Sequence, residues 1–286
     1  ADGVVKRISD LFSEKVLHSD DQWEPMSIDP TLMPYPQEAD GYATVIQTAK
    51  PEFQWSDATL NFKRPNKNNL IIYELWVYDH TQHRSIAGLM ERMQYFEDMG
   101  VNAIELMPVT EFDGNENWGY SPNHYFALDK AYGTPEQLKT FIDECHKRGI
   151  AVILDMVFNH ATGLNPMNKL YPWGTDLSNN PWFNVTAPHS DNVYEDWNHD
   201  FGPTKTMFIR SLQYWLEEYK VDGYRMDLSH GLCGTSANTS VKHIKEYYEK
   251  GVKAVAEDAY FILEHWGSNM GSERPQLVNA GMLCWD

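Results

Sequence analysis

The segment VDGYRMDLSH, residues 221–230, is the part of the chain around which the rest can be interpreted. It follows an apolar pattern of helical spacing over residues 207–219, and its first half is typical of a short buried strand. Arg225 and Asp227 lie two residues apart, so a strand places both side chains on one face. A charge on the inner face of a parallel strand is costly unless it is paired and hydrogen-bonded. The pair is therefore either a structural ion pair or a carboxylate kept ionised as a nucleophile, with a pKa lowered by the guanidinium.

The composition restricts the class of protein. The 286 residues are 42% hydrophobic and 22% charged, which suits one large α/β domain with at most a small appendage. A formal net charge of -18 argues against a nucleic-acid or membrane partner and is compatible with a neutral substrate. No apolar run is long enough to span a membrane, so we expect a soluble protein, and no signal indicates its compartment. The three cysteines show neither metal spacing nor a disulfide framework.

From residue 69 onward, short apolar runs alternate with amphipathic segments. Strands are predicted at 70–77, 101–107, 150–158, 221–227, 260–263 and 280–285, and helices at 86–99, 134–148, 204–219 and 240–256. Gly100 and Gly149 end two of these helices, and Thr134-Pro135 begins one of them. This alternation predicts a parallel sheet with right-handed crossovers, residues 69–286 forming one barrel-type domain.

Two stretches depart from this pattern. Residues 1–68 are rich in proline and polar residues and show little periodicity, which indicates an irregular approach segment or the tail of a preceding β-domain. Residues 160–203 are rich in Asn, Pro and Trp and are too long for a plain connection. A connection of this length is either functional or a small domain, so we interpret it as an inserted subdomain after the third strand.

Polar residues follow the carboxyl ends of the predicted strands, as they do at the active face of a (β/α)-barrel. The first strand ends near Tyr78-Asp79-His80, and the loop after the second carries Tyr120. The other candidates are Asp155, Asn159 and His160 after the third strand, Arg225, Asp227 and His230 at the fourth, and Glu264, His265 and Trp266 at the fifth. Any one of them is weak evidence, whereas their convergence on one barrel mouth is strong.

Several of these stretches resemble the signature motifs of the α-amylase family. DMVFNH (155–160), GYRMDLSH (223–230) and FILEHW (261–266) are similar to three signatures in order, and GVNAIELMP (100–108) is similar to the family's second strand. His265 stands where many members have a smaller residue. YEL (73–75) and ELMPV (105–109) look most like the branching, debranching and trehalose-forming branch, in which a glucan-binding β-sandwich often precedes the barrel. The implied fold is an α/β, TIM (β/α)8-type barrel.

The resemblance implies a role for each matched residue. Asp227 would attack the anomeric carbon, and Glu264 would act as acid and then as base. In a retaining enzyme two such carboxyls lie roughly 5–5.5 Å apart. The substrate-binding residues would be Tyr120, His160, Arg225, Asp155 and His265. The implied activity is that of a retaining glycoside hydrolase or transglycosidase of starch- or glycogen-type α-glucans, working by double displacement without a required cofactor.

Asn159 has two open interpretations. In the family this residue often helps to hold a structural calcium ion, for which oxygen ligands are suited. Alternatively, its side chain hydrogen-bonds the long loop, since branching-type relatives often lack the ion. A catalytic metal would instead need a cluster of histidines and carboxylates with an open coordination position. The histidines at 80, 160, 230 and 265 are the candidates for such a cluster, and we regard a catalytic metal as the weaker alternative.

The chain departs from the family in one respect. Members use a third carboxylate, in an Asn-His-Asp motif after the seventh strand, but the only such motif here, at 198–200, precedes the fourth. The sequence stops at Asp286, about where a sixth strand would end, so we expect a barrel incomplete at its C-terminus. We expect residues 1–286 alone to be inactive or nearly so. The alternative function is a non-catalytic glucan-binding fragment, and the bond type and the acceptor, water or sugar, stay open.

Overall fold

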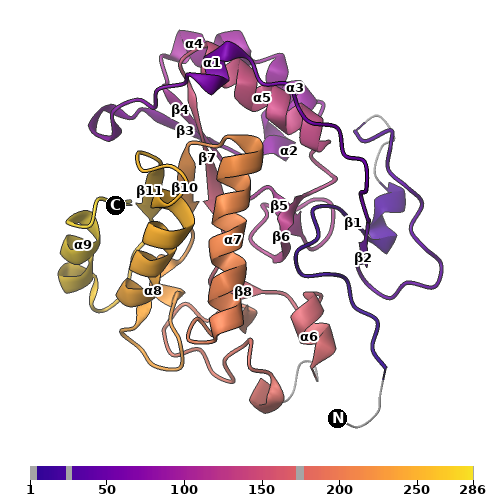
Figure 1. Cartoon of the computed structure of the whole chain (residues 1–286), viewed down its shortest axis with the longest axis vertical. Coiled ribbons are helices and arrows are strands. Elements are labelled where there is room, and N and C mark those ends of the chain that lie inside the picture. The colour runs from indigo at the N-terminus through magenta and orange to yellow at the C-terminus, as the bar shows by residue number, and fades with distance from the viewer. Residues whose placement is uncertain (1–4, 24–27, 172–176, 286) are drawn as a thin grey trace.

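The computed structural model describes residues 5–23, 28–171 and 177–285 (Figure 1). Within them, six parallel strands form the main sheet, and each pairs with the strand before it in this series. The strands are β3 (Ile72–Leu75), β4 (Ala103–Leu106), β7 (Ala151–Met156), β10 (Gly223–Met226), β11 (Tyr260–Leu263) and β12 (Leu283–Cys284). This order is that of a singly wound barrel, because an open doubly wound sheet reverses direction at a switch point. The sheet is a curled half-barrel whose described edges are β3 and β12.

The helices lie between these strands and confirm most of the predicted series. They are α1 (Asp57–Leu60), α2 (Val77–His80), α3 (Ile86–Met90), α4 (Met93–Met99), α5 (Pro135–Lys147), α6 (Pro166–Leu170), α7 (Gly202–Tyr219), α8 (Ser240–Tyr247) and α9 (Met270–Val278). The α8 helix continues into a π-type turn, η5 (Tyr248–Lys253). Four single 3-10 turns are η1 (Ser19–Trp23), η2 (Lys67–Asn69), η3 (Leu177–Asn179) and η4 (Ser229–Gly231).

Local sequence explains where the helices begin and end. Thr134 caps α5 by accepting from the main-chain N–H of Gln137, and the Gln137 side chain accepts from the N–H of Thr134, a complete capping box. Gly100 ends α4 with a φ of 69°. The single helix predicted over residues 86–99 is wrong, because the structure has two. Gly88 lies in the first, where a Cβ would come within 2.1 Å of Thr81 Oγ1, and a glycine weakens a helix.

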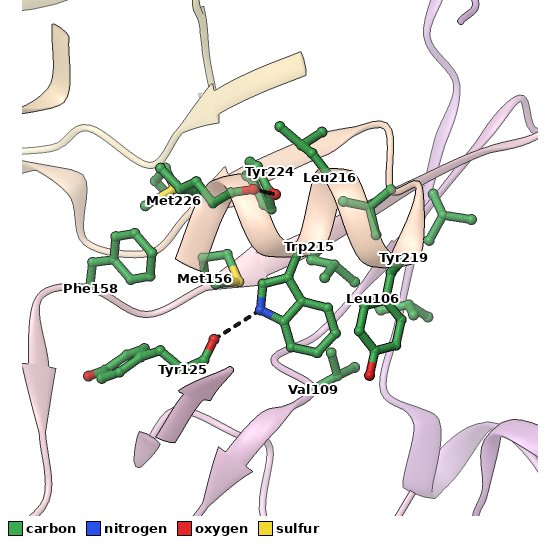
Figure 2. Packing of buried hydrophobic residues seen from close by; sticks show 14 of the residues in the cluster. Leu106, Val109, Tyr125, Met156, Phe158, Trp215, Leu216, Tyr219, Tyr224 and Met226 are labelled. Atoms are coloured by element: carbon green, nitrogen blue, oxygen red, sulfur yellow. Dashed lines mark hydrogen bonds between the residues drawn. The ribbon is translucent and has the colours of Figure 1, made fainter. Parts of the chain in front are cut away.

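The outer face of the sheet packs against α7 and forms the main apolar core. Figure 2 shows Trp215 of α7 between Leu106, Met156 and Met226, which come from three neighbouring strands. The Trp215 indole N–H donates to the main-chain oxygen of Tyr125, at 2.9 Å, so its polar atom is satisfied. This packing fixes the outer side chains of the strands, and the alternate residues therefore point inward.

The inner face carries a smaller apolar cluster at its base. Ala103, Ala151, Ile153, Tyr260 and Ile262 are buried there, with the side chains at positions 62, 70 and 283 packed against them. One pleat further along β4, β7, β10 and β11, toward the carboxyl ends, the inward residues become charged. The inner face of the sheet is therefore apolar near the amino ends of its strands and polar near their carboxyl ends. We call this polar end the mouth.

Three short antiparallel pairs stand beside the main sheet. They are β1 (Val16–Leu17) with β2 (Ala43–Thr44), β5 (Thr110–Phe112) with β6 (Pro122–Leu128), and β8 (His160–Ala161) with β9 (Glu195–Asp196). In Figure 1 the β1–β2 pair lies at the side of the molecule next to β5 and β6. Tyr42 joins the two regions, because its hydroxyl donates to the main-chain oxygen of Phe112 at 2.7 Å.

The segment before β3 is attached to the half-barrel by buried polar contacts. The hydroxyls of Ser56 and Thr59 both donate to Asp143 of α5, at 2.7 and 2.6 Å. The Nε of Arg64 lies 3.1 Å from Asp222 at the start of β10. The segment thus follows the surface of the barrel. That it continues a preceding β-sandwich stays a prediction.

The stretch from 160 to 203 contains α6, η3 and the β8–β9 pair. In its described part, Phe183 and Trp197 belong to the main apolar core, and the Trp197 indole donates to the hydroxyl of Tyr125 at 2.8 Å. The interpretation as a separate subdomain stays a prediction. No helix in the described ranges is long and apolar enough to cross a membrane.

Candidate active site

Arg225, on the inner face of β10, is the centre of the polar mouth. Its Nη1 donates to both carboxylate oxygens of Asp155, at 3.1 and 3.0 Å, and to Oδ1 of Asp227, at 3.0 Å. Its Nη2 lies 3.0 Å from Oε2 of Glu264. In the strand register Arg225 stands opposite Asp155 on β7 and Ile262 on β11, which explains how three strand ends meet at one guanidinium. The prediction that Arg225 and Asp227 share one face is confirmed.

A fourth carboxyl group belongs to this site. Glu105, on β4, is 8% exposed and interacts electrostatically with Arg225 and Glu264. Burial raises the pKa of Glu105 to about 7, Arg225 lowers it in part, and Glu74 and Glu264 raise it further. Sequence reasoning missed this residue, although it stands inside a quoted motif. The alternation of side chains along the second strand turns Glu105 inward, and this was the signal that could have identified it.

The pKa of Asp227 differs from the sequence prediction. We expected the guanidinium to hold it low, but burial raises the pKa of Asp227 to about 7, and Arg225 offsets only part of that rise. A hydrogen bond to Glu264 raises it as well. The prediction was wrong because it counted the neighbouring cation and left out both desolvation and the second carboxyl group.

Asp155 and Tyr120 form a buried pair beside Arg225. The Tyr120 hydroxyl donates to Oδ2 of Asp155 at 2.7 Å. Burial raises the pKa of Asp155, which is fully buried, and Arg225 lowers it in part. Gly119 lets the chain turn here, because it has a φ of 98° and a Cβ would come within 2.4 Å of the Pro108 main-chain oxygen. The WGY triplet therefore places the ring of Tyr120 at the mouth.

His160 is buried next to Tyr120, and both its ring nitrogens have partners. Its Nδ1 lies 3.0 Å from Asn159 Nδ2, which also donates to the main-chain oxygen of Asp191. Nδ1 must therefore accept, and Nε2 carries the proton that it donates to the Tyr120 main-chain oxygen, at 2.8 Å. Burial lowers the pKa of His160 to about 4, so the ring is neutral at physiological pH. Tyr194, which sequence reasoning also missed, faces this ring at 5.6 Å and is 59% exposed.

Glu264, at the end of β11, is held by main-chain as well as side-chain donors. The N–H of Leu228 donates to its Oε2 at 2.9 Å, in addition to Arg225. Leu228 has φ 42° and ψ 46°, a left-handed conformation that leucine rarely adopts. Strained residues of this kind persist where the surroundings over-determine them, and they concentrate at functional sites.

His265 does not lie in the mouth, contrary to its prediction as a substrate-binding residue. Its side chain is fully buried, and its ring nitrogens contact Ser229 Oγ at 3.1 Å and Glu273 Oε2 at 3.1 Å. Successive residues of a strand point to opposite sides, so His265 points away from the face that presents Glu264. The mouth at this end is bordered instead by Trp266 and Trp285, whose rings stack at 5.8 Å. Trp285 also covers the guanidinium of Arg225 at 4.8 Å.

Asn159 has one property of a metal ligand. It is fully buried, and its Oδ1 has no hydrogen-bond partner. Its Nδ2, as described above, ties β7 to the main chain at Asp191, which is the loop-anchoring role weighed from the sequence.

The surroundings of Asn159 do not fit a calcium ion. Calcium takes six to eight oxygen ligands, several of them from carboxylates. Asp196 is instead bound to His189, at 2.6 Å, and Asp191 faces His230, at 3.8 Å. No cluster of three His, Cys, Asp or Glu in the described residues could hold a metal. We therefore derive no step through a metal.

These features define a class: a parallel half-barrel with a pair of carboxylates on adjacent strand ends, bridged by one arginine. The family model for the α-amylase catalytic domain matches residues 59–207. The chain belongs to the α-amylase family.

Individual relatives agree with this assignment. A malto-oligosyltrehalose trehalohydrolase of Saccharolobus solfataricus is 31% identical over 235 residues, covering 81% of this chain and 39% of that protein. A 1,4-α-glucan branching enzyme of Halothermothrix orenii is 34% identical over 163 residues, covering 54% and 25%. The crystal structure of a putative α-amylase from Salmonella typhimurium is similar with a TM-score of 0.64 and 25% identity, over 79% of this chain and 37% of that one. The chain spans less than half the length of these relatives.

Proposed function

We propose that this chain carries the nucleophile and the acid–base of a retaining glycosidase or transglycosidase that acts on α-glucans by double displacement. The observation that carries the proposal is the pairing of Asp227 and Glu264 on neighbouring strand ends, both at 3.0 Å from one guanidinium. Two carboxyls that share one guanidinium are close together, as in retaining enzymes. Inverting enzymes hold them farther apart to admit a water molecule.

Each group has one task in the first step. An ionised Asp227 oxygen attacks the anomeric carbon, and the bond from that carbon to the leaving oxygen breaks. Glu264 transfers its proton to the leaving oxygen and becomes a carboxylate. The products are a glycosyl ester on Asp227 and a shortened glucan.

The second step reverses these roles. The Glu264 carboxylate takes a proton from water or from a sugar hydroxyl, whose oxygen attacks the anomeric carbon. The ester bond to Asp227 breaks, and the carboxylate is restored. Water as acceptor gives hydrolysis, and a sugar hydroxyl gives transfer. The route uses no cofactor.

The other side chains of the mouth support a sugar substrate. Arg225 stabilises the carboxylate forms, and Asp155 keeps both Arg225 and Tyr120 in place. The apolar face of a sugar stacks on aromatic rings such as Tyr120. Trp118, two residues before Tyr120 in the sequence, is 61% exposed and offers a second aromatic surface. Its ring centre lies 6.4 Å from that of Trp76. His160 stays a proposed contact to sugar hydroxyls. The net charge of -18 again disfavours nucleic acid and anionic membranes.

The test uses soluble starch and the protein at its full natural length. Release of reducing sugar indicates hydrolysis, and loss of iodine colour without it indicates branching. Asp227→Asn should lower turnover about 10⁴-fold or more, because a covalent catalyst is removed. Asp57→Asn, an exposed aspartate of α1, is the matched control and should leave turnover unchanged. Glucan binding without turnover in the unmodified protein would favour the non-catalytic alternative.

A further inference from the structure

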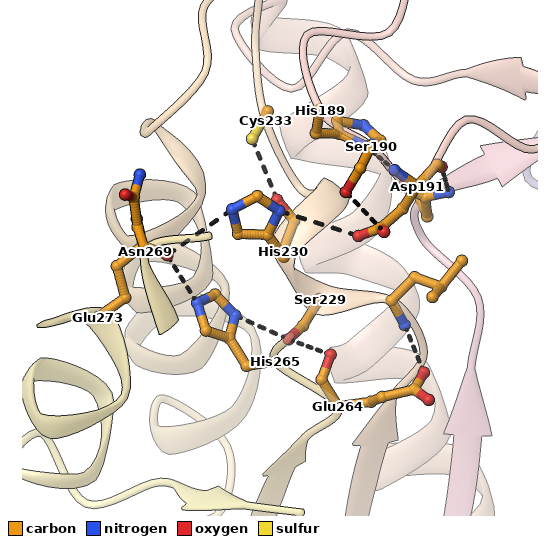
Figure 3. Close-up of polar contacts among 12 residues, drawn as sticks. His189, Ser190, Asp191, Ser229, His230, Cys233, Glu264, His265, Asn269 and Glu273 are labelled. Atoms are coloured by element: carbon orange, nitrogen blue, oxygen red, sulfur yellow. Dashed lines mark hydrogen bonds and ion pairs between the residues drawn. The ribbon is translucent and has the colours of Figure 1, made fainter. Parts of the chain in front are cut away.

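A buried polar chain lies behind Glu264, on the side away from the mouth (Figure 3). It runs from Glu273 on α9 through His265 to Ser229 in η4, and we name these three residues the rear triad. Their side chains are nearly or fully buried, with Glu273 5% exposed and the other two 0%. Burying such groups costs free energy that an apolar filling would not cost.

The triad is connected without a gap. Glu273 Oε2 lies 3.1 Å from His265 Nε2, and His265 Nδ1 lies 3.1 Å from Ser229 Oγ. The Ser229 hydroxyl and the Ser229 main-chain N–H both lie 2.9 Å from the main-chain oxygen of Glu264. The chain therefore ends on the backbone of the proposed acid itself.

Ser229 lies between His265 and Glu264, and the protonation state of the ring decides which of them receives its hydroxyl proton, while its main-chain N–H donates to the Glu264 oxygen in both states. A neutral His265 protonated on Nε2 donates to Glu273 and accepts the hydroxyl proton of Ser229 on Nδ1. A protonated His265 donates on both nitrogens, and the hydroxyl proton of Ser229 then goes to the Glu264 oxygen. In both states Glu273 fixes the ring, and the ring fixes Ser229.

Ser229 in turn holds Leu228 in its strained conformation. The two residues are adjacent, and Leu228, whose φ is 42°, donates its N–H to Oε2 of Glu264. A non-glycine residue is strained in this region, so the turn would relax if it were released. The bond from the Ser229 main-chain N–H to the Glu264 oxygen opposes that relaxation, and the Ser229 hydroxyl adds a second bond when its proton points to the same oxygen.

A second histidine packs against the triad. His230 lies 3.8 Å from both Glu273 and Asp191, and its ring centre is 5.6 Å from that of His265. Gly267 makes room for it, since a Cβ there would come within 2.8 Å of the ring. Arg274 also faces the triad, because its Nε donates to the main-chain oxygen of His265 at 2.8 Å. Strand β11, η4 and α9 are thus locked together around the end of the strand that carries Glu264.

We propose that the rear triad of Glu273, His265 and Ser229 positions the carboxyl group of Glu264 for proton transfer, by holding the Leu228 N–H on its Oε2. The inference rests on the proposed function, in which Glu264 is the acid–base. The triad residues touch no reacting atom in this scheme and are positioning residues. His265, first predicted to bind substrate, receives its role here.

The test compares Ser229→Ala and Glu273→Gln with the unmodified protein at its full natural length. Two variants at opposite ends of the triad are used, and thermal unfolding checks that each is folded. Ser272→Ala, an exposed serine at the start of α9, is the matched control. Each protein is assayed on soluble starch and on an aryl α-glucoside whose leaving group needs little protonation.

We expect kcat on starch to fall about 10- to 100-fold in both triad variants with KM little changed, since small misplacements of a catalytic group have costs of this size. The first step on the aryl glucoside should fall less than about threefold, because it needs little acid catalysis. The limb of the pH profile that reports the acid should move to higher pH, because a carboxylate that loses an N–H donor holds its proton more tightly.

Two results separate the possible failures. The positioning role is overturned if the folded Ser229→Ala and Glu273→Gln variants keep an unchanged pH profile and lose activity equally on both substrates. It is also overturned if they keep an unchanged pH profile and lose no activity. Glu264→Gln tests the underlying function. If it keeps starch activity, Glu264 is not the acid and the proposed function fails. If it is inactive while the triad variants are normal, only the positioning role fails.

Discussion

Replacing Glu105 with glutamine should make the protein more stable, and increasingly so as the pH rises. Glu105 lies on the inner face of β4, 8% exposed, where burial raises its pKa to about 7 from a usual value of 4.5. Between these two pH values the unfolded chain has released the proton and the folded protein still holds it. The free energy of unfolding therefore falls as the pH rises through this window and levels off above 7.

The magnitude follows from the same two values. Each pKa unit corresponds to about 1.4 kcal/mol, so the step from 4.5 to about 7 amounts to about 3 kcal/mol at most. Glutamine has nearly the same shape and does not ionise. Glu105→Gln should thus match the unmodified protein within about 0.5 kcal/mol at pH 4.5, and exceed it by about 2–3 kcal/mol at pH 8.

The assay is urea unfolding followed by tryptophan fluorescence at several pH values from 4.5 to 8, with the free energy obtained by linear extrapolation. Glu257→Gln, an exposed glutamate before β11, is the control, and its difference from the unmodified protein should not change over this range. A Glu105→Gln difference that stays flat or shrinks with rising pH would refute the reasoning. It would show that Glu105 is ionised in the folded protein without cost.

The remaining predictions concern the mouth and its surroundings. Because Asp227 must be ionised to attack and its pKa is about 7, kcat/KM should rise with pH through an apparent pKa near 7, and a profile flat from 5.5 to 8 would contradict this. Tyr120→Phe keeps the ring but removes a donor to Asp155, so kcat/KM should fall about tenfold and the free energy of unfolding by about 1–3 kcal/mol. Both quantities can be measured on one preparation, and an unchanged free energy of unfolding would show that water replaces the hydroxyl. Dialysis against a chelator should leave the melting temperature unchanged within about 1 °C, because the described groups around Asn159 do not form a set of oxygen ligands. A fall in the melting temperature that calcium reverses would show that they do.

The strand–helix order could be predicted because its signals are local. A strand buried on both faces reads as a continuous apolar run, as at Tyr260–Leu263, which matches the prediction residue for residue. Caps such as Thr134 and Gly100 depend on a few neighbouring residues. Helix continuity over residues 86–99 failed because the chain interrupts the helix at residues 91–92, where neither a proline nor a glycine signals a break.

The electrostatics of the site could not be predicted because they depend on several strands at once. Sequence spacing shows that Arg225 neighbours Asp227, but not that Glu105 and Glu264 approach the same cation from other strands. Desolvation, which dominates the pKa of Asp227, depends on how completely the mouth is enclosed. His265 was misplaced for a related reason. A motif places a residue at a strand end, while the direction of its side chain follows from the alternation along that strand.

The donor pattern in the mouth has a mechanistic consequence. In the unliganded protein Oε2 of Glu264 receives the Leu228 N–H and faces Arg225, whereas Asp227 accepts from the Arg225 side chain and has a pKa raised to about 7. A pKa of about 7 leaves Asp227 protonated in a large share of the free protein, whereas the attack on the anomeric carbon requires the carboxylate. Productive binding of the sugar therefore favours the form in which Asp227 has released its proton. The acidic limb in kcat, which reports the complex, should then lie at lower pH than the limb in kcat/KM, which reports the free protein. Coincident limbs would mean that the free protein already holds the reactive ionisation state.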